Sequence, residues 1–258
     1  MYRFLATPRW LGFAALMLLL AVIMVGLGDW QLHRYRERAA INDRIDAAAT
    51  ATPRPLAAVV PAPRTAPVGP RPPDSAEWSR VQVSGVYDAG HEILARGRTV
   101  GGGVGFEVLT PLVLPDGGAV VVDRGWLPAP PGGALVAPQV PVAPAGTVTV
   151  VGRVRLPESG ADHPVTFDGR PSVRRIAPAR LTAAVPYPLF DAYVTLDSQT
   201  PAADGRFTAI PTDHENAWQN AGYVVQWWAF AALTAFGYVR LARREAHARN
   251  DEEQPVPV

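Results

Sequence analysis

The sequence contains no cysteine, and its only methionines are Met1, Met17 and Met24. Without thiols the chain cannot form disulfides, carry out thiol redox chemistry or bind zinc or copper through cysteine sulfur. Three methionines near one end also do not form the Met-rich cluster that a copper carrier uses. The composition therefore excludes a thiol enzyme and a copper-delivery protein.

The sequence also lacks an excess of charge of one sign, because its formal net charge is only +1. Nucleic-acid binding needs a broad basic field, which this balance does not supply. Basic residues do gather locally, in residues 34–38 and 240–249, and both clusters lie beside apolar runs. This placement is typical of membrane flanks. We therefore expect contact with membrane lipid and no nucleic-acid partner.

Motifs of the common enzyme classes are missing as well. The sequence has no Gly-x-Ser-x-Gly elbow, and no Gly-x-Gly-x-x-Gly leads from a strand into a helix. Residues 101–103 are three glycines between strand candidates, which indicates a hairpin loop. No two of the five histidines stand at a metal-ligand spacing. We expect a protein that is not an enzyme and has no catalytic residues and no metal site.

Two uncharged apolar runs, residues 10–27 and 221–239, are each long enough to cross a bilayer. The first could instead be a cleaved signal peptide, but no small-residue cleavage site directly follows it. The second could instead be a buried core helix. Trp and Tyr near the ends of both runs suit the aromatic belt of a membrane surface. We favour an uncleaved first span and a second span.

Charge predicts the orientation, since Arg3 and Arg9 precede the first span and four arginines follow the second. Both termini are expected in the cytoplasm and the middle outside, in a plasma-membrane protein with two spans. The predicted order is a cytoplasmic N-terminus (1–9), a first transmembrane helix (10–28), a helical extension with a Pro-rich linker (29–73), an extracytoplasmic β domain (74–212), an entry segment (213–220), a second transmembrane helix (221–239) and a cytoplasmic tail (240–258).

The middle of the chain is rich in strand signals with tight turns. Alternating or continuous apolar patterns predict strands at residues 78–87, 91–98, 105–114, 119–126, 147–156 and 193–196, and a short helix at 178–184. The fold class is thus an α+β membrane protein, in which two transmembrane helices flank a small, mostly antiparallel β sandwich or barrel.

Four motifs occur in order along nearly the whole chain. They are Trp30-Gln31-x-x-Arg34 beyond the first span, Arg80-Val81-x-x-x-Gly85-x-Tyr87 with the Gly105–Leu112 run, Arg124-Gly125-Trp126-Leu127-Pro128 at a strand end, and Tyr223-x-x-Gln226-Trp227-Trp228 in the second span. This set resembles the Surfeit locus protein 1 family, and the closing Gln-Trp-Trp resembles an actinobacterial form. The resemblance implies that residues of these motifs contact haem or a partner, namely Trp30, Gln31, Arg34, Arg124, Gly125, Trp126, Tyr223, Gln226 and Trp227.

The resemblance implies a respiratory-chain assembly factor, a chaperone for haem–copper oxidases of the aa3 cytochrome c oxidase type. Such a protein would help to deliver or stabilise haem a at the catalytic subunit of the oxidase. Its partners would be that subunit and the enzymes of haem a synthesis, with haem a as a transient cofactor. The alternative is a cofactor-free scaffold that is anchored in the membrane and binds an oxidase subunit.

The sequence departs from the family where a histidine linked to haem binding is expected, because Asn220 stands there. An amide cannot replace imidazole as an axial iron ligand. His214, six residues earlier, is the candidate replacement, and His33 lies at the outer mouth of the first span. The alternative is that haem is not held through this helix at all.

Two further pairs of residues each have two interpretations. Gln31 and Arg34 share a helical face that could bind a carboxylate or a haem propionate, or Arg34 could bind only lipid phosphate. Arg124 and Trp126 could form a corner that binds a partner, or a structural cation–π pair at the base of the sheet. The residues themselves leave both choices open.

Overall fold

The computed structural model describes residues 3–64, 66–133, 135–202 and 205–252. Its contacts divide the chain into two units, which are considered separately. A helical unit contains the chain up to Asp43 and from His214 onward, and a β unit contains Arg44–Asp213.

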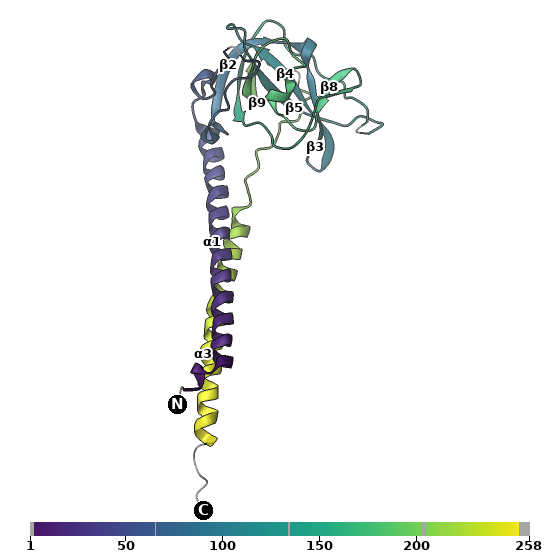
Figure 1. Cartoon of the computed structure of the whole chain (residues 1–258). Coiled ribbons are helices and arrows are strands. Elements are labelled where there is room, and N and C mark those ends of the chain that lie inside the picture. Colours follow the sequence, from purple (N-terminus) through teal and green to yellow (C-terminus); the bar gives the residue numbers. More distant parts are fainter. Residues whose placement is uncertain (1–2, 65, 134, 203–204, 253–258) are drawn as a thin grey trace, which may run out of the picture. The chain divides into compact units, whose positions relative to one another are not determined.

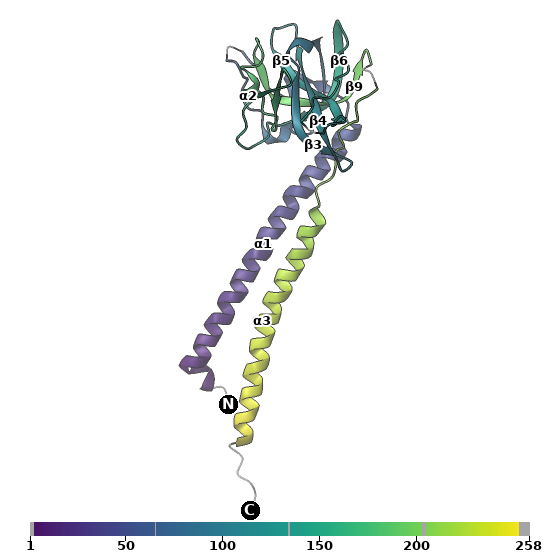
Figure 2. The same ribbon diagram turned by 90° about the vertical axis from the view of Figure 1, so that its right-hand side faces the viewer.

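Two long helices make up most of the helical unit. After a short 3-10 turn (Arg3–Ala6), α1 extends over Pro8–Thr50, and α3 extends over Ala217–Glu252. The two helices lie side by side in Figures 1 and 2. The 43 residues of α1 measure about 65 Å, roughly twice what a bilayer core requires. The predicted helical continuation of the first apolar run is confirmed.

Within the described residues, one helix, α1, is long and apolar enough to cross a membrane. Many of its large apolar side chains are exposed, among them Leu11, Leu18 and Val22. The second apolar run forms part of α3, and Gln226 and several aromatic residues make it the less apolar of the two helices.

The β unit is a mixed sheet closed into a small barrel. The strands are β1 (Arg54–Pro55), β2 (Arg80–Tyr87), β3 (Ile93–Val100), β4 (Gly103–Val113), β5 (Ala119–Pro128), β6 (Thr147–Arg155), β7 (Val165–Phe167), β8 (Arg170–Val173) and β9 (Leu189–Thr200). Strands β2, β6, β9, β5 and β4 form a ring, while β3, β8 and β7 extend the sheet beyond β4. Figure 2 shows β3, β4 and β5 running alongside one another. Most pairings are antiparallel, but β5–β9, β3–β8 and β1–β2 are parallel.

The ring closes where β2 meets β4. Only Val86↔Val113 and Tyr87↔Leu112 pair there, whereas β2 and β6 pair over seven positions. Gly85 precedes this junction, and a Cβ atom at Gly85 would overlap the carbonyl oxygen of Val113. A residue without a side chain is therefore needed for the two strands to approach each other.

The core lies on both sides of β5. Val120 and Val122 pack inside the barrel with Leu112 and Phe190, while the alternate residue Val121 packs outside. The outer cluster is completed by residues from β3, β9 and the segment around the short helix α2 (Pro178–Leu181). Since both faces of β5 are buried, its sequence has no polar alternation, as the continuous apolar run predicted.

The predicted Pro-rich linker is corrected by the structure. Leu56 and Val60 in this segment are buried in the barrel core, and Arg54 pairs with β2. Further along, Gly69 donates a backbone hydrogen bond to Leu189. Proline's extended conformation suits a segment that runs along a sheet edge, and the few apolar residues among the prolines anchor it there.

Candidate functional site

Gln31 of the first motif joins Asn220 on α3 and Arg38 on α1 in a chain of polar side chains, which we call the interhelical polar chain. Asn220 Nδ2 donates to Gln31 Oε1 at 2.7 Å, and Arg38 Nη1 donates to Asn220 Oδ1 at 3.1 Å. Asn220 is only 9% exposed. Its amide therefore donates to and accepts from α1, and this pairing stabilises the two helices against each other.

The polar contacts continue toward the C-terminal end of α1. Arg38 Nη1 also donates to the backbone oxygen of Asn216 at 3.1 Å. Asn42 makes a two-way contact with the backbone of Glu215: its Nδ2 donates to the oxygen at 2.9 Å, and its Oδ1 accepts from the N–H at 2.7 Å. These bonds satisfy backbone groups just before and at the start of α3, and so fix where that helix begins.

Just before Gln31 on α1, the two helices pack closely at Gly28. A Cβ atom at Gly28 would overlap the indole of Trp228, so the small residue allows the ring to lie against α1. The motif residues Trp30, Tyr223 and Trp228 are nevertheless substantially exposed. Trp227 contacts Phe230 edge-on at 6.2 Å, on its own helix. These aromatic rings are available to lipid or to a partner.

Gln31 and Arg34 have different neighbours within the protein. Gln31 turns to Asn220, whereas Arg34 forms an exposed ion pair with Glu37 at 3.1 Å on the same helix. The binding of a carboxylate or a haem propionate by their shared helical face, or of lipid phosphate by Arg34 alone, stays a prediction. His33 also contacts Glu37, at 3.1 Å. His214 is exposed and lies just before α3.

Asn220, which stands where the resemblance leads us to expect a haem-linked histidine, does not fit an axial ligand to haem iron. Asn220 offers an amide, and both ends of that amide are already hydrogen-bonded to α1. His33 and His214 are both exposed, and neither belongs to the buried polar chain. Among the described residues, no group of three His, Cys, Asp or Glu side chains is placed to hold a metal ion.

The second family motif, at the end of β5, is buried. The Arg124 side chain is fully buried and lies 4.9 Å from the ring centroid of Phe207 and 5.6 Å from that of Tyr87. It donates to the backbone oxygens of Pro141 and Val142 at 3.1 and 3.3 Å. A guanidinium enclosed by two rings and two carbonyls is not accessible to a partner, which favours the structural interpretation. Among the described residues, however, the rings that Arg124 contacts are those of Tyr87 and Phe207 and not that of Trp126, with which the sequence predicted the pair.

Gly125 and Trp126 complete this arrangement. Gly125 has φ +131°, and a Cβ atom there would lie only 3.0 Å from Phe207. Trp126 exchanges two backbone hydrogen bonds with Thr208, both 2.9 Å, and its indole N–H donates to the oxygen of Arg98. The motif therefore holds the segment around Thr208 and strand β3, at Arg98, against the end of β5, and does not form a surface for a partner.

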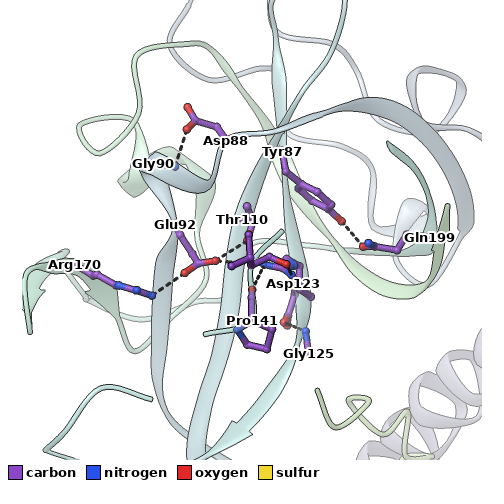
Figure 3. Close-up of polar contacts among 12 residues, drawn as sticks. Tyr87, Asp88, Gly90, Glu92, Thr110, Asp123, Gly125, Pro141, Arg170 and Gln199 are labelled. Carbon is purple, nitrogen blue, oxygen red and sulfur yellow. Dashed lines mark hydrogen bonds and ion pairs between the residues drawn. The ribbon is translucent and has the colours of Figure 1, made fainter. Parts of the chain in front are cut away.

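The charge of Arg124 is balanced by Glu92, which accepts from it at 3.4 Å. Glu92 also accepts from Arg170 at 2.8 Å and from Thr110 at 3.4 Å, as Figure 3 shows. Burial raises the pKa of Glu92, although the two arginines oppose that shift. Burial likewise lowers the pKa of Arg124. Two cations sharing one carboxylate keep that carboxylate charged against the cost of burial.

A second buried carboxyl belongs to Asp123, the residue before Arg124. Asp123 is 2% exposed, and its Oδ1 accepts from the backbone N–H of Gly125 at 3.2 Å (Figure 3). Burial raises the pKa of Asp123 well above its ordinary value, and the nearby Glu107 raises it further. Arg98 pairs with Glu107 at 2.8 Å and with Glu158 at 2.7 Å, which relieves part of this repulsion.

Sequence reasoning missed Arg38 and Asn42, although a signal was present. Gln31, Arg38 and Asn42 stand seven and four residues apart, so they share one face of α1. A polar stripe of that spacing beyond an apolar run indicates a helix that has a polar partner. The partner on α3 is Asn220, which the sequence singled out only as a missing histidine.

Comparison with known proteins gives one family. The family model described as the SURF1 family matches residues 18–232. A SURF1-like protein of Mycobacterium tuberculosis is 30% identical over 257 residues, covering 98% of this chain and 91% of the relative. A SURF1-like protein of Monosiga brevicollis is 28% identical, covering 98% and 95%. Surfeit locus protein 1 of Takifugu rubripes is 30% identical over 161 residues, covering 55% and 61%.

Proposed function

Because the chain belongs to the SURF1 family, which is generally linked to cytochrome c oxidase assembly, we propose that it is a membrane-anchored assembly factor for an aa3-type haem–copper oxidase. The observation that carries the proposal is the sequence match of both helices and the β unit, since the family model covers residues 18–232 and a SURF1-like relative aligns with 98% of the chain. In this proposal α1 and α3 both span the plasma membrane, with both termini cytoplasmic and the β unit outside. The partner is the catalytic subunit of the oxidase.

The proposal is tested by removing the gene from a host that carries this chain and an aa3-type oxidase. We expect a several-fold loss of haem a absorbance in the membranes, restored by the wild-type gene. Unchanged oxidase in the deletion strain would overturn the assembly role. An unrelated cytochrome in the same membranes serves as the control for general loss of respiratory protein.

Two modes of action follow from the family, and a specific observation separates them. In the first mode, the protein passes haem a to the catalytic subunit, with His214 as the candidate ligand. In the second, it holds an oxidase subunit without any cofactor. The closed hydrogen bonding of Asn220 with Gln31 and Arg38 favours the second mode, because the family's haem-linked position is engaged in helix pairing.

The two modes differ in the absorption spectrum of the purified protein. The full chain is produced together with the enzymes of haem a synthesis, beside His214→Ala and Asn220→His variants. Scaffold action predicts no haem a signal in the wild type. A wild-type signal that His214→Ala removes would instead establish a haem carrier. Asn220→His, which restores the family's imidazole, shows whether the helix pair can take up haem when a ligand is supplied.

A further inference from the structure

At the start of α1 and the end of α3, a depression of about 720 Å³ separates the two helices. We call it the basic-aromatic pocket. Its apolar lining comes from Trp10, Phe13 and Leu241, and its charged lining comes from Arg9, Arg244, Arg249 and Glu245. It belongs wholly to the helical unit, and neither the proposed assembly role nor the family motifs use these residues.

The aromatic side of the pocket is held by ring contacts. Trp10 contacts Phe4 at 5.0 Å and Tyr238 of α3 at 6.0 Å, while Phe13 contacts Tyr238 at 5.7 Å between ring centroids. The rings therefore connect the two helices and fix the position of the Trp10 indole. Trp at this level of an apolar helix is the residue that prefers a membrane–water interface.

The charged side of the pocket has a net surplus of positive charge. Glu245, the one acidic residue among the lining residues, pairs with Arg249 at 2.9 Å. The Arg249 guanidinium also lies 5.1 Å from the ring centroid of Phe4. Within the described residues, the side chains of Arg9 and Arg244 have no acidic partner. Two guanidinium groups are thus left to bind an anion.

The surroundings of the pocket suit an anion that carries a long apolar body. Leu241 lines the pocket and is exposed, and Leu11 and Leu16, two and seven residues after Arg9 on α1, are exposed apolar side chains as well. A free anion would gain only the arginine contacts, whereas a lipid would also cover these side chains. The first N–H groups of α1 add a partial positive charge next to Arg9.

We propose that the basic-aromatic pocket binds the phosphate headgroup of an anionic phospholipid, with Arg9 and Arg244 contacting the phosphate and Trp10 packing beside the glycerol. The inference rests on the membrane placement of both helices given under the proposed function. Bound lipid bridges the two helices at the end opposite the interhelical polar chain, and so would hold the pair together at both ends.

The test is native mass spectrometry of the full chain in detergent, titrated separately with phosphatidylglycerol, with phosphatidylcholine of the same acyl chains, and with inorganic phosphate. We expect phosphatidylglycerol to bind at least about tenfold more tightly than phosphatidylcholine. The double variant Arg9→Gln/Arg244→Gln should reduce that preference to within about twofold. Binding of inorganic phosphate with equal affinity would overturn the lipid assignment and leave an anion site.

The matched control is Arg240→Gln/Arg243→Gln. It also removes two positive charges at this end of the helix pair, but from side chains that do not line the pocket. This variant should keep most of the preference for phosphatidylglycerol. An equal loss in both double variants would overturn the pocket and leave only general charge attraction. Alkaline extraction of membranes distinguishes failure of the lipid-binding pocket from failure of the membrane placement. If the chain stays in the membrane but shows no preference for phosphatidylglycerol, only the pocket is refuted. If extraction releases the chain, the membrane placement of the helices is refuted as well.

Discussion

The two units use arginine in opposite ways. In the β unit, Arg124 is buried between two rings and shares Glu92 with Arg170. In the helical unit, Arg34 belongs to an equally characteristic motif, yet among the described residues its side chain pairs only with Glu37, an exposed glutamate one helical turn away. A motif residue in one unit therefore builds the fold, and a motif residue in the other is available for contact. Similar sequence signals do not imply similar roles.

Truncating Arg124 and Arg34 separately tests whether the two arginines have these different roles. Arg124→Ala removes a buried cation and leaves Glu92 and two backbone carbonyls without that donor, so we expect a loss of about 3–5 kcal/mol in the free energy of unfolding. Arg34→Ala removes an exposed ion pair and should cost less than about 1 kcal/mol. Denaturant unfolding of the detergent-solubilised chain measures both.

Equal losses in the two variants would contradict the assignment of Arg124 as structural. The oxidase readout sharpens the comparison further. Arg124→Ala should lower oxidase only as far as it lowers the amount of folded protein. Arg34→Ala should leave the protein level unchanged, so that any fall in oxidase would report a lost contact.

The second comparison is between two glycines of α1. Gly28→Ala brings a methyl group into the Trp228 indole, whereas a Cβ at Gly26 meets nothing within 4 Å. We expect Gly28→Ala to weaken helix pairing by about 1–3 kcal/mol, the usual cost of overpacking. Gly26→Ala should be neutral or slightly stabilising through its helix propensity.

Crosslinking between cysteines introduced at Leu32 and Ala217 in each glycine variant measures the pairing. A lower yield in Gly28→Ala than in Gly26→Ala is the expected result. Equal yields would show that the indole moves aside and that the close approach does not hold the helices.

The third prediction concerns the buried carboxyl of Asp123. Its raised pKa means that the folded protein keeps a proton that the unfolded chain loses above about pH 4. The wild type should therefore lose about 1.4 kcal/mol of stability from this group for each unit of rising pH, until the folded carboxyl ionises. Asp123→Asn keeps the acceptor for Gly125 and removes this loss.

Denaturant unfolding of both proteins between pH 4 and pH 8 measures the effect. The stability of Asp123→Asn relative to wild type should rise with pH. A difference that stays constant with pH would show that Asp123 ionises normally in the folded protein. Asp116→Asn, on an exposed turn, is the control for replacing one carboxyl by an amide.

The smallest expected effect is at the interhelical polar chain. Asn220→Leu leaves Gln31 and Arg38 without their amide partner and should cost about 1 kcal/mol of helix pairing. Gln219→Leu, on the exposed neighbour, should change pairing little. The same cysteine crosslinking at positions 32 and 217 measures both, and an equal effect would indicate a general response to an added apolar side chain.

The local patterns of the sequence predicted most of the elements, but the contacts between distant segments needed the structure. Alternation placed β2 and β6 to within two residues, and the apolar run of β5 indicated a strand buried on both faces. The barrel closure, the parallel β5–β9 pair and the burial of Leu56 depend on distant partners, and no short-range period encodes them. β9 was predicted at residues 193–196 but covers Leu189–Thr200, so that four residues were missed at each end, and the last four are polar.

The candidate site shows the same division. Family motifs identified Gln31, Arg124 and Trp126, but neither spacing nor composition indicated that Arg124 would be enclosed. Asn220 stood out as the missing histidine, and only its contacts to Gln31 and Arg38 give it a role. A side chain's chemistry is readable from the sequence, whereas its neighbours are set by tertiary packing.

The narrow junction between β2 and β4 has a consequence for how the barrel opens. With only two paired positions there, fewer contacts must break than along any other edge of the ring. Thermal fluctuation should part the barrel at this seam first, and deuterium should reach the amide of Asp88, which donates to Pro111 of β4, before the amides of β5. Exchange should therefore be faster at the β2–β4 junction than in the rest of the barrel, and Gly85 is the residue that allows this junction to close.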